Sequence, residues 1–191
     1  MTKDVKYLAL DGAHNALDYL FQSLVFLAQV EQNLFYLKWF VISFHSAVYG
    51  FMLLVLQAKD HSLIYEVLPG HLGGKKKQNG FDPLEGKLIS FTAAYKYLKN
   101  STKMNGKPFP ATNQQSICIT ELNNKLRSQM VHFKPMVWAS ESWYPARVCQ
   151  PLLDLLRFCI KDDGVHLDKS EKNSALAYLE SIDKLLIKHA E

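Results

Sequence analysis

An arginine and a histidine stand five positions apart in the segment ELNNKLRSQMVHFKP, which runs from Glu121 to Pro135. An imidazole changes its charge near neutral pH, so His132 could take a proton from one group and give it to another. An arginine fork suits a phosphate whose negative charge grows in a transition state. RNA carries its own nucleophile, the ribose 2′-hydroxyl. Arg127 and His132 therefore fit metal-free cleavage of RNA to a 2′,3′-cyclic phosphate.

One helix is predicted to carry both residues. Thr112 and Gln115 have the spacing of a capping box, and Pro135 forbids continuation, so the helix should cover about residues 113–133. Apolar residues recur at helical spacing along one side and form its expected buried stripe: Ile119, Leu122, Leu126, Met130 and Phe133. The opposite face is left for solvent or for a ligand.

Polar residues gather on that opposite face. Asn124, Ser128 and His132 have i, i+4, i+8 spacing and form one row, with Arg127 beside it. At about 100° per residue, Arg127 and His132 lie about 140° apart. One helix therefore does not easily aim both side chains at one atom. A facing copy across a two-fold axis would bring two arginines and two histidines into one groove. The spacing alone also fits a solvated face with a histidine at the helix end.

The segment LNNKLRSQMVHFKPMVW resembles the signature helix of the HEPN superfamily, whose motif is R-x(4–6)-H, and the likeness extends to HF-x-P-x-x-W. HSAVYGFMLL, which begins at His45, resembles the second helix of such proteins. The resemblance covers roughly residues 13–160. It implies an all-α bundle that dimerises through the motif helix. Many members are metal-independent endoribonucleases of toxin–antitoxin, abortive-infection or CRISPR systems, and others have lost catalysis.

Carried onto this chain, the resemblance implies that Arg127 binds and stabilises the scissile phosphate and that His132 is the acid–base residue. Asn124 and Ser128 form the supporting polar face. Possible RNA contacts are lysines, namely Lys75, Lys76, Lys77, Lys125 and Lys134. Ser128 stands where the superfamily often has asparagine. Lys134 stands where one toxin subfamily has a tyrosine, which puts in doubt an antitoxin that modifies such a tyrosine.

Composition limits the class of protein. The chain has 191 residues, 48% hydrophobic and 21% charged, which is typical of one soluble globular domain. A net charge of +4 is compatible with a polyanionic partner but does not require one. The sequence contains no C-x-x-C pair, and its three cysteines, Cys118, Cys149 and Cys159, are expected to be reduced core residues of a cytoplasmic protein.

The start lacks a signal-peptide pattern. The histidines show no metal-ligand spacing, and neither metal nor cofactor is expected.

The remaining apolar periodicity predicts further helices, and no strand pair is persuasive. Their expected ranges are about 12–33 with Asp11 as N-cap, 35–59, 88–99, 147–161 with Pro151 in the first turn, and 170–189. Residues 68–86 are dense in glycine and predict a long loop insertion. The fold class expected is all-α: a HEPN-like antiparallel helical bundle in one domain over 1–191, with a core at about 13–160 and an extra C-terminal helix.

The segment WFVISFHSAVYGFMLLVLQ, residues 39–57, is nearly as long as a membrane span. It contains His45, Ser43 and Ser46, so a buried central helix is favoured over a transmembrane helix, and no membrane partner is expected. Within it, His45 is expected to be hydrogen-bonded in the core, and Gly50 is expected to permit close helix packing.

Two further segments contain residue types that could bind a ligand. GHLGGKKKQNG fails the phosphate-loop pattern, because it lacks the hydroxyl residue and follows a helix. For its lysines, exposure to solvent in a loop is favoured over contact with RNA phosphates. A base could stack on the aromatic side chains of Trp138, Trp143 and Tyr144. A structural role, in which they pack the bend against the bundle, is favoured for them.

The leading expectation is a cytoplasmic homodimer that cleaves RNA as a toxin or phage-defence effector, with a possible antitoxin or regulatory protein as partner. The alternative is a non-catalytic HEPN-fold dimer that binds RNA, nucleotide or a protein.

Overall fold

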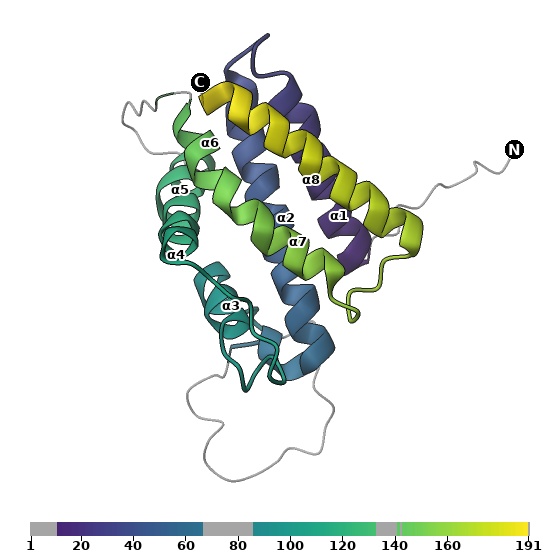
Figure 1. The fold of residues 1–191 in the computed structure, drawn as a ribbon. Coiled ribbons are helices and arrows are strands. Elements are labelled where there is room, and N and C mark those ends of the chain that lie inside the picture. The colour runs from purple at the N-terminus through teal and green to yellow at the C-terminus, as the bar shows by residue number, and fades with distance from the viewer. Residues whose placement is uncertain (1–10, 67–85, 133–140, 142, 191) are drawn as a thin grey trace, which may run out of the picture.

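Helices account for the architecture of residues 11–66, 86–132, 141 and 143–190, which are the residues that this computed structural model describes (Figure 1). In chain order the elements are α1 (Gly12–Ala28), α2 (Phe35–Lys59), the 3-10 turn η1 (His61–Ile64), α3 (Phe91–Leu98), α4 (Asn113–Thr120), the π-helical segment η2 (Glu121–Arg127), α5 (Ser128–Val131), α6 (Trp143–Cys149), the 3-10 turn η3 (Gln150–Leu152), α7 (Leu153–Lys161) and α8 (Lys169–Ala190). Tyr65 and Leu88 form an isolated antiparallel bridge. The described residues contain no β-strand. The all-α prediction is confirmed.

The helices α1 and α2 form a closely packed antiparallel hairpin (Figure 1). Asp11 caps α1 as predicted, because its carboxylate accepts the backbone N–H of His14 at 2.9 Å. A Cβ added at Gly50 would lie 2.9 Å from the Cβ of Ala16, so only a glycine lets the two backbones approach this far. The prediction that Gly50 permits close helix packing is confirmed.

The helix α2 passes through the hydrophobic core. Its fully buried side chains include Phe40, Phe44, Phe51 and Val55. Length and a mean hydropathy of 1.8 would also allow it to cross a membrane. However, 61% of its apolar window is buried inside the protein, which is how the core helix of a soluble bundle behaves. This burial supports the prediction of a central helix.

Two predicted helix boundaries are wrong, for local reasons. The first helix ends at Ala28 and not at Asn33, because turns follow from Gln29, and the Asn33 side chain accepts the backbone N–H of Phe35 at 3.0 Å just before α2. The third helix begins at Phe91, not at Leu88. Ser90 caps it by accepting the N–H of Ala93 at 3.2 Å.

The motif helix begins as predicted but changes its winding. The capping box is present: the Thr112 hydroxyl accepts the Gln115 N–H at 3.1 Å, and the Gln115 side chain accepts the Thr112 N–H at 2.9 Å. The helix then continues through η2 and α5 and ends at Val131, two residues before the predicted end. His132 is its C-cap with an extended backbone (φ −87°, ψ 125°).

The segment that follows also differs from the prediction. A bend was expected through Ala146, with a helix from Arg147, but α6 already begins at Trp143. Pro145 lies in its first turn, where a missing N–H costs little. Pro151 lies in η3, between α6 and α7, so the prediction of one helix over about 147–161 with Pro151 in its first turn is wrong.

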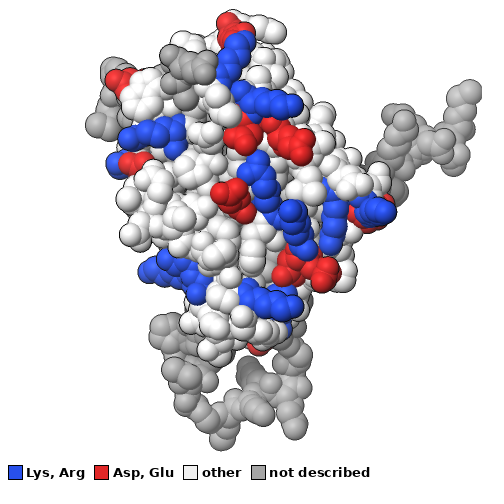
Figure 2. Space-filling model, viewed as in Figure 1, with Lys and Arg blue, Asp and Glu red and all other residues white. Residues whose placement is uncertain are grey.

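The C-terminal helix α8 packs across α1, α6 and α7 (Figure 1). One continuous buried cluster runs from Ala13 in α1 to Leu186 in α8. The outer face of α7 and α8 carries Lys and Arg interspersed with Asp and Glu (Figure 2). Arg157, for example, contacts both Asp154 at 2.9 Å and Asp183 at 3.2 Å. That face therefore presents no single-sign field to a charged partner.

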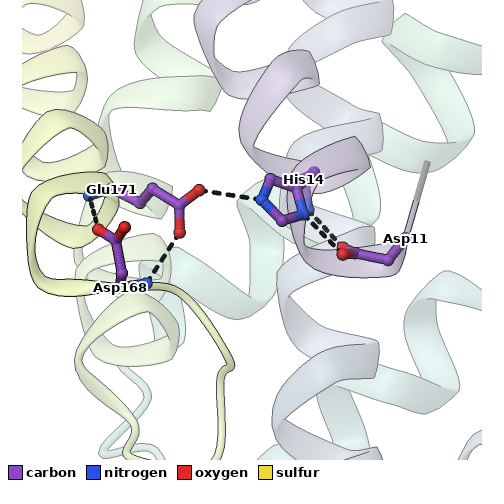
Figure 3. Close-up of polar contacts among 4 residues, drawn as sticks. All are labelled: Asp11, His14, Asp168 and Glu171. Atoms are coloured by element: carbon purple, nitrogen blue, oxygen red, sulfur yellow. Dashed lines mark hydrogen bonds and ion pairs between the residues drawn. The ribbon is translucent and has the colours of Figure 1, made fainter. Parts of the chain in front are cut away.

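His14 links the start of α1 to the start of α8 (Figure 3). Its Nδ1 lies 2.6 Å from Asp11 and its Nε2 lies 2.9 Å from Glu171. Glu171 also accepts the backbone N–H of Asp168 at 2.8 Å, and Asp168 accepts that of Glu171, which makes a capping box for α8. We call these four residues the His14 clasp. The side-chain hydrogen bond with Asp11 and the charges of both carboxylates raise the pKa of His14.

Candidate functional site

The motif helix is π-wound over Glu121–Arg127, directly before Ser128. A π turn closes i→i+5 hydrogen bonds, so it is wider than an α turn, and such turns are frequent at functional sites. The α-helical spacing therefore does not hold between residues before and after this segment, whereas the stretch from Arg127 to His132 runs through the α-helical α5. The buried stripe survives the change, because Leu122 and Leu126 are both fully buried.

Arg127 lines a groove with a volume of about 600 Å³. The floor and walls come from α1, α2, η1, the bridge residue Leu88 and the end of the motif helix. Most of the lining is apolar, and the polar side chains that share it with Arg127 are Asn15, Tyr19, His45, Ser46, Tyr49 and Gln57. The Ser46 hydroxyl donates to the Ile42 carbonyl at 2.9 Å, and that of Tyr49 donates to Ile89.

The charge of Arg127 has no counterion in the part of the chain that the structure describes. Its side chain is half-buried, and no carboxylate there lies within ion-pair distance of it. Arg147 lies 4.0 Å from Glu121, and Arg157 contacts two aspartates. A half-buried guanidinium that lacks a carboxylate is a ready partner for an external anion.

His132 does not share this groove within one chain. It is exposed at the C-cap of α5 and is absent from the groove lining, whereas its neighbour Val131 contributes to it. The structure therefore brings Arg127 to a cavity and leaves His132 on the surface beside it. As the helical arithmetic suggested, one chain does not aim both side chains at one atom.

The supporting residues lie in mixed environments. Asn124 is exposed, Ser128 is half-buried, and Lys125 pairs with Glu121 at 2.9 Å, which neutralises part of its charge. The remaining predicted RNA contacts, Lys75, Lys76, Lys77 and Lys134, lie outside the described residues, as do Phe133, Pro135, Trp138 and most of the 68–86 loop.

A second histidine lines the groove on the side of α2. His45 is 8% exposed, and its Nε2 lies 3.1 Å from Asn123 Oδ1 on η2. The Asn123 amide donates from Nδ2 to Asn124 Oδ1 at 2.7 Å, which leaves Oδ1 as the acceptor for His45. In this arrangement His45 Nε2 carries the proton, and Nδ1 is an unprotonated acceptor.

The surroundings of His45 favour the neutral ring. Burial lowers the pKa of His45 to about 4; the hydrogen bond with Asn123 opposes this shift, and the positive charge of Arg127 adds to it. The ring also stacks on Phe91 with centroids 4.2 Å apart. The prediction that His45 is hydrogen-bonded in the core is confirmed, but its place in the Arg127 groove was not anticipated.

Other candidate chemistry finds little support among the described residues. They contain no group of three His, Cys, Asp or Glu side chains able to hold a metal ion. Cys118, Cys149 and Cys159 are free and buried, as predicted, and burial raises the pKa of each thiol. Arg147 lies over the rings of Trp143 and Tyr144, at 5.3 and 5.1 Å. That contact fits a structural role for the two rings.

Comparison with known proteins adds no relative. No family model, no curated protein and no solved structure matches this chain. The HEPN resemblance rests on the quoted segments alone.

Sequence reasoning missed one member of the site. The sequence pattern does not indicate Asn123, because it stands one position before the polar row. Its amide nevertheless connects the motif helix to His45 on α2, 78 positions away in the chain. The similarity of the segment beginning at His45 to a second HEPN helix was the available signal, but it did not specify this contact.

Proposed function

We propose that this protein is a HEPN-type, metal-independent endoribonuclease that leaves 2′,3′-cyclic phosphate ends. The observation that carries the proposal is Arg127: a half-buried cation in the wall of a groove of about 600 Å³, without a carboxylate partner in the described part of the chain. A phosphodiester is an anion that such a guanidinium binds through parallel hydrogen bonds, and it gains charge at the oxygens on reaching the transition state.

The roles proposed for the motif residues follow from their chemistry. Arg127 stabilises the scissile phosphate, and His132 transfers protons at the reacting oxygens. Because His132 is exposed outside the groove of its own chain, we propose a homodimer in which two motif helices face each other and complete two sites. Exposed apolar residues at both ends of this helix, Ile117 (53% exposed) and Val131 (43% exposed), favour such a contact.

The biological setting is proposed on the HEPN resemblance alone. The protein would act in the cytoplasm as a toxin or phage-defence effector, held silent by an antitoxin or another regulatory protein.

The test is cleavage of a mixed RNA pool in EDTA by wild type, Arg127→Ala and His132→Ala. Removal of a group that stabilises or moves charge in the transition state should lower the cleavage rate by about 100-fold or more for each variant. Arg147→Ala is the matched control, because that arginine is 53% exposed and borders Glu121, and it should retain wild-type activity. Cyclic phosphate ends identify the reaction, and the mass in solution tests the dimer.

The alternative is a non-catalytic dimer that binds RNA, nucleotide or a protein. The position of His132 outside the groove is the observation that favours it. A folded dimer that binds RNA through Arg127 but never cuts it would establish this function. Equal cleavage by wild type and both variants would mark the activity as contamination and overturn the nuclease proposal.

A further inference from the structure

His45 presents a fixed, neutral hydrogen-bond acceptor in the Arg127 groove. Its Nε2–H is engaged by Asn123 at 3.1 Å, and its ring face lies on Phe91 at 4.2 Å. These two contacts, from η2 and α3, hold the ring from two directions, and α2 supplies its backbone. The remaining polar atom of the side chain is Nδ1, whose lone pair is unprotonated in this tautomer.

Nδ1 is open to the groove. It has no hydrogen-bond partner among the described residues, whereas every fully buried side-chain nitrogen or oxygen there has one. Nδ1 is therefore not fully buried, and the cavity that His45 borders is the Arg127 groove. The hydroxyls of Ser46 and Tyr49, which share this wall, already donate to backbone carbonyls. A ligand group that meets Nδ1 must bring the proton of the hydrogen bond itself.

A cation and a neutral acceptor in one groove match a ribonucleotide. Arg127 attracts the anionic oxygens of a phosphodiester. On the 3′ side of each ribose, the 2′-hydroxyl stands next to that phosphate and is a hydrogen-bond donor. DNA has the same phosphate without the hydroxyl, so an acceptor at this place distinguishes the two polymers.

We propose that His45 recognises the ribose 2′-hydroxyl of the nucleotide whose phosphate Arg127 binds, and so selects RNA over DNA. This inference rests on the proposed function, because it places RNA at the same groove. The charged group that acts on His45 is Arg127 on η2; α3 contributes the uncharged ring of Phe91, and Tyr49 of its own helix contributes a phenol. His45 is neutral at the pH of the cell and accepts the hydroxyl there.

The test compares oligonucleotides of one length and randomised sequence with RNA, DNA and 2′-fluoro-RNA sugars. Anisotropy titrations at one fixed salt concentration give the affinities, with His132→Ala present in every protein to prevent cleavage. One neutral hydrogen bond predicts that RNA binds about 5- to 10-fold tighter than 2′-fluoro-RNA, which cannot donate it. Adding His45→Phe keeps a ring against Phe91 and removes the acceptor. It should abolish this preference while DNA affinity stays unchanged.

Two further variants separate the causes of failure. Adding Arg127→Ala should weaken binding of all three polymers alike, because each has phosphates. His45→Leu replaces His45→Phe if the phenyl variant does not fold by circular dichroism. If RNA binding needs Arg127 but the preference for the 2′-hydroxyl survives loss of the imidazole, the inference about His45 is wrong and the RNA site stands. If no polymer binds any form, the proposed function fails and the inference fails with it.

Discussion

The ring of His45 lies in the wall of the Arg127 groove, hydrogen-bonded to an amide, whereas the ring of His14 lies on the surface between two carboxylates. Burial and the nearby arginine charge lower the pKa of His45 to about 4. Hydrogen bonds and negative charge raise that of His14. The surroundings thus favour the neutral ring in one region and the charged ring in the other.

The comparison separates two uses of a histidine. In the clasp both ring nitrogens meet carboxylates, so both must donate, and the ring contributes as an imidazolium (Figure 3). In the groove one nitrogen meets an amide oxygen and the other is left with a lone pair. The first arrangement joins two helices and leaves no atom for a ligand. The second leaves an acceptor available, which is why we place function at His45 and not at His14.

The largest effect should come from acid, through His45. Its pKa near 4 in the folded state lies below the value of 6.5 of a free histidine, so the unfolded chain binds more protons between these values. The contribution is intact above pH 6.5 and is lost as the pH falls, by about 3 kcal/mol near pH 4. Urea unfolding of wild type and His45→Gln at both ends of this window measures it. The free energy of unfolding of the wild type should fall relative to that of the variant as the pH falls. A difference between the two proteins that does not change with pH would contradict the neutral ring.

The next effect should come from the amide that orients His45. Asn123→Leu removes the acceptor of a mostly buried N–H and should lower the free energy of unfolding by about 1–3 kcal/mol. It should also lower the pKa of His45 further, because the hydrogen bond with Asn123 opposes the effect of burial.

Asn173→Leu is the matched control for that variant, since Asn173 is an exposed asparagine of α8 far from this network, and it should cost less than about 0.5 kcal/mol. Nitrogen-detected NMR of the imidazole follows the titration. Equal unfolding energies for the two variants would show that Asn123 does not anchor the ring.

The smallest effect should come from the His14 clasp, and with the opposite sign. A raised pKa gives stabilisation that is complete below pH 6.5 and is lost as the pH rises through the folded-state value. Glu171→Gln is the sharpest variant, because an amide oxygen can keep the capping box with Asp168 while the charge is removed. Thermal unfolding at low salt should separate wild type from the variant below pH 6.5 more than above it.

Salt provides the contrast between the two regions. At about 1 M salt the screening length is near 3 Å, so the exposed clasp should lose its pH dependence while the buried His45 keeps most of its own. If salt removes both effects equally, the two histidines do not differ in environment as the structure shows.

Elements governed by local chemistry could be predicted from the sequence. The range 35–59 was predicted for α2 and is its observed extent, because the long apolar run ends at Lys59 and Asp60. The Asp11 cap and the Thr112–Gln115 capping box each join residues three positions apart, so a short pattern specifies them. Arg127 was likewise named from its spacing to His132, and its chemistry as an anion ligand follows from residue type.

What the tertiary structure decided is which of these residues meet. The π-wound turn at Glu121–Arg127 has no pattern of its own in the sequence, and it changes the α-helical spacing of the residues along it. The absence of a carboxylate near Arg127 in the described chain, and the contact between His45 and Asn123 across 78 positions, depend on how distant helices pack. The link between His14 and Glu171 spans 157 positions for the same reason. A sequence pattern fixes contacts within a turn of helix, whereas the charge and protonation of a buried side chain depend on neighbours that only the folded chain brings together.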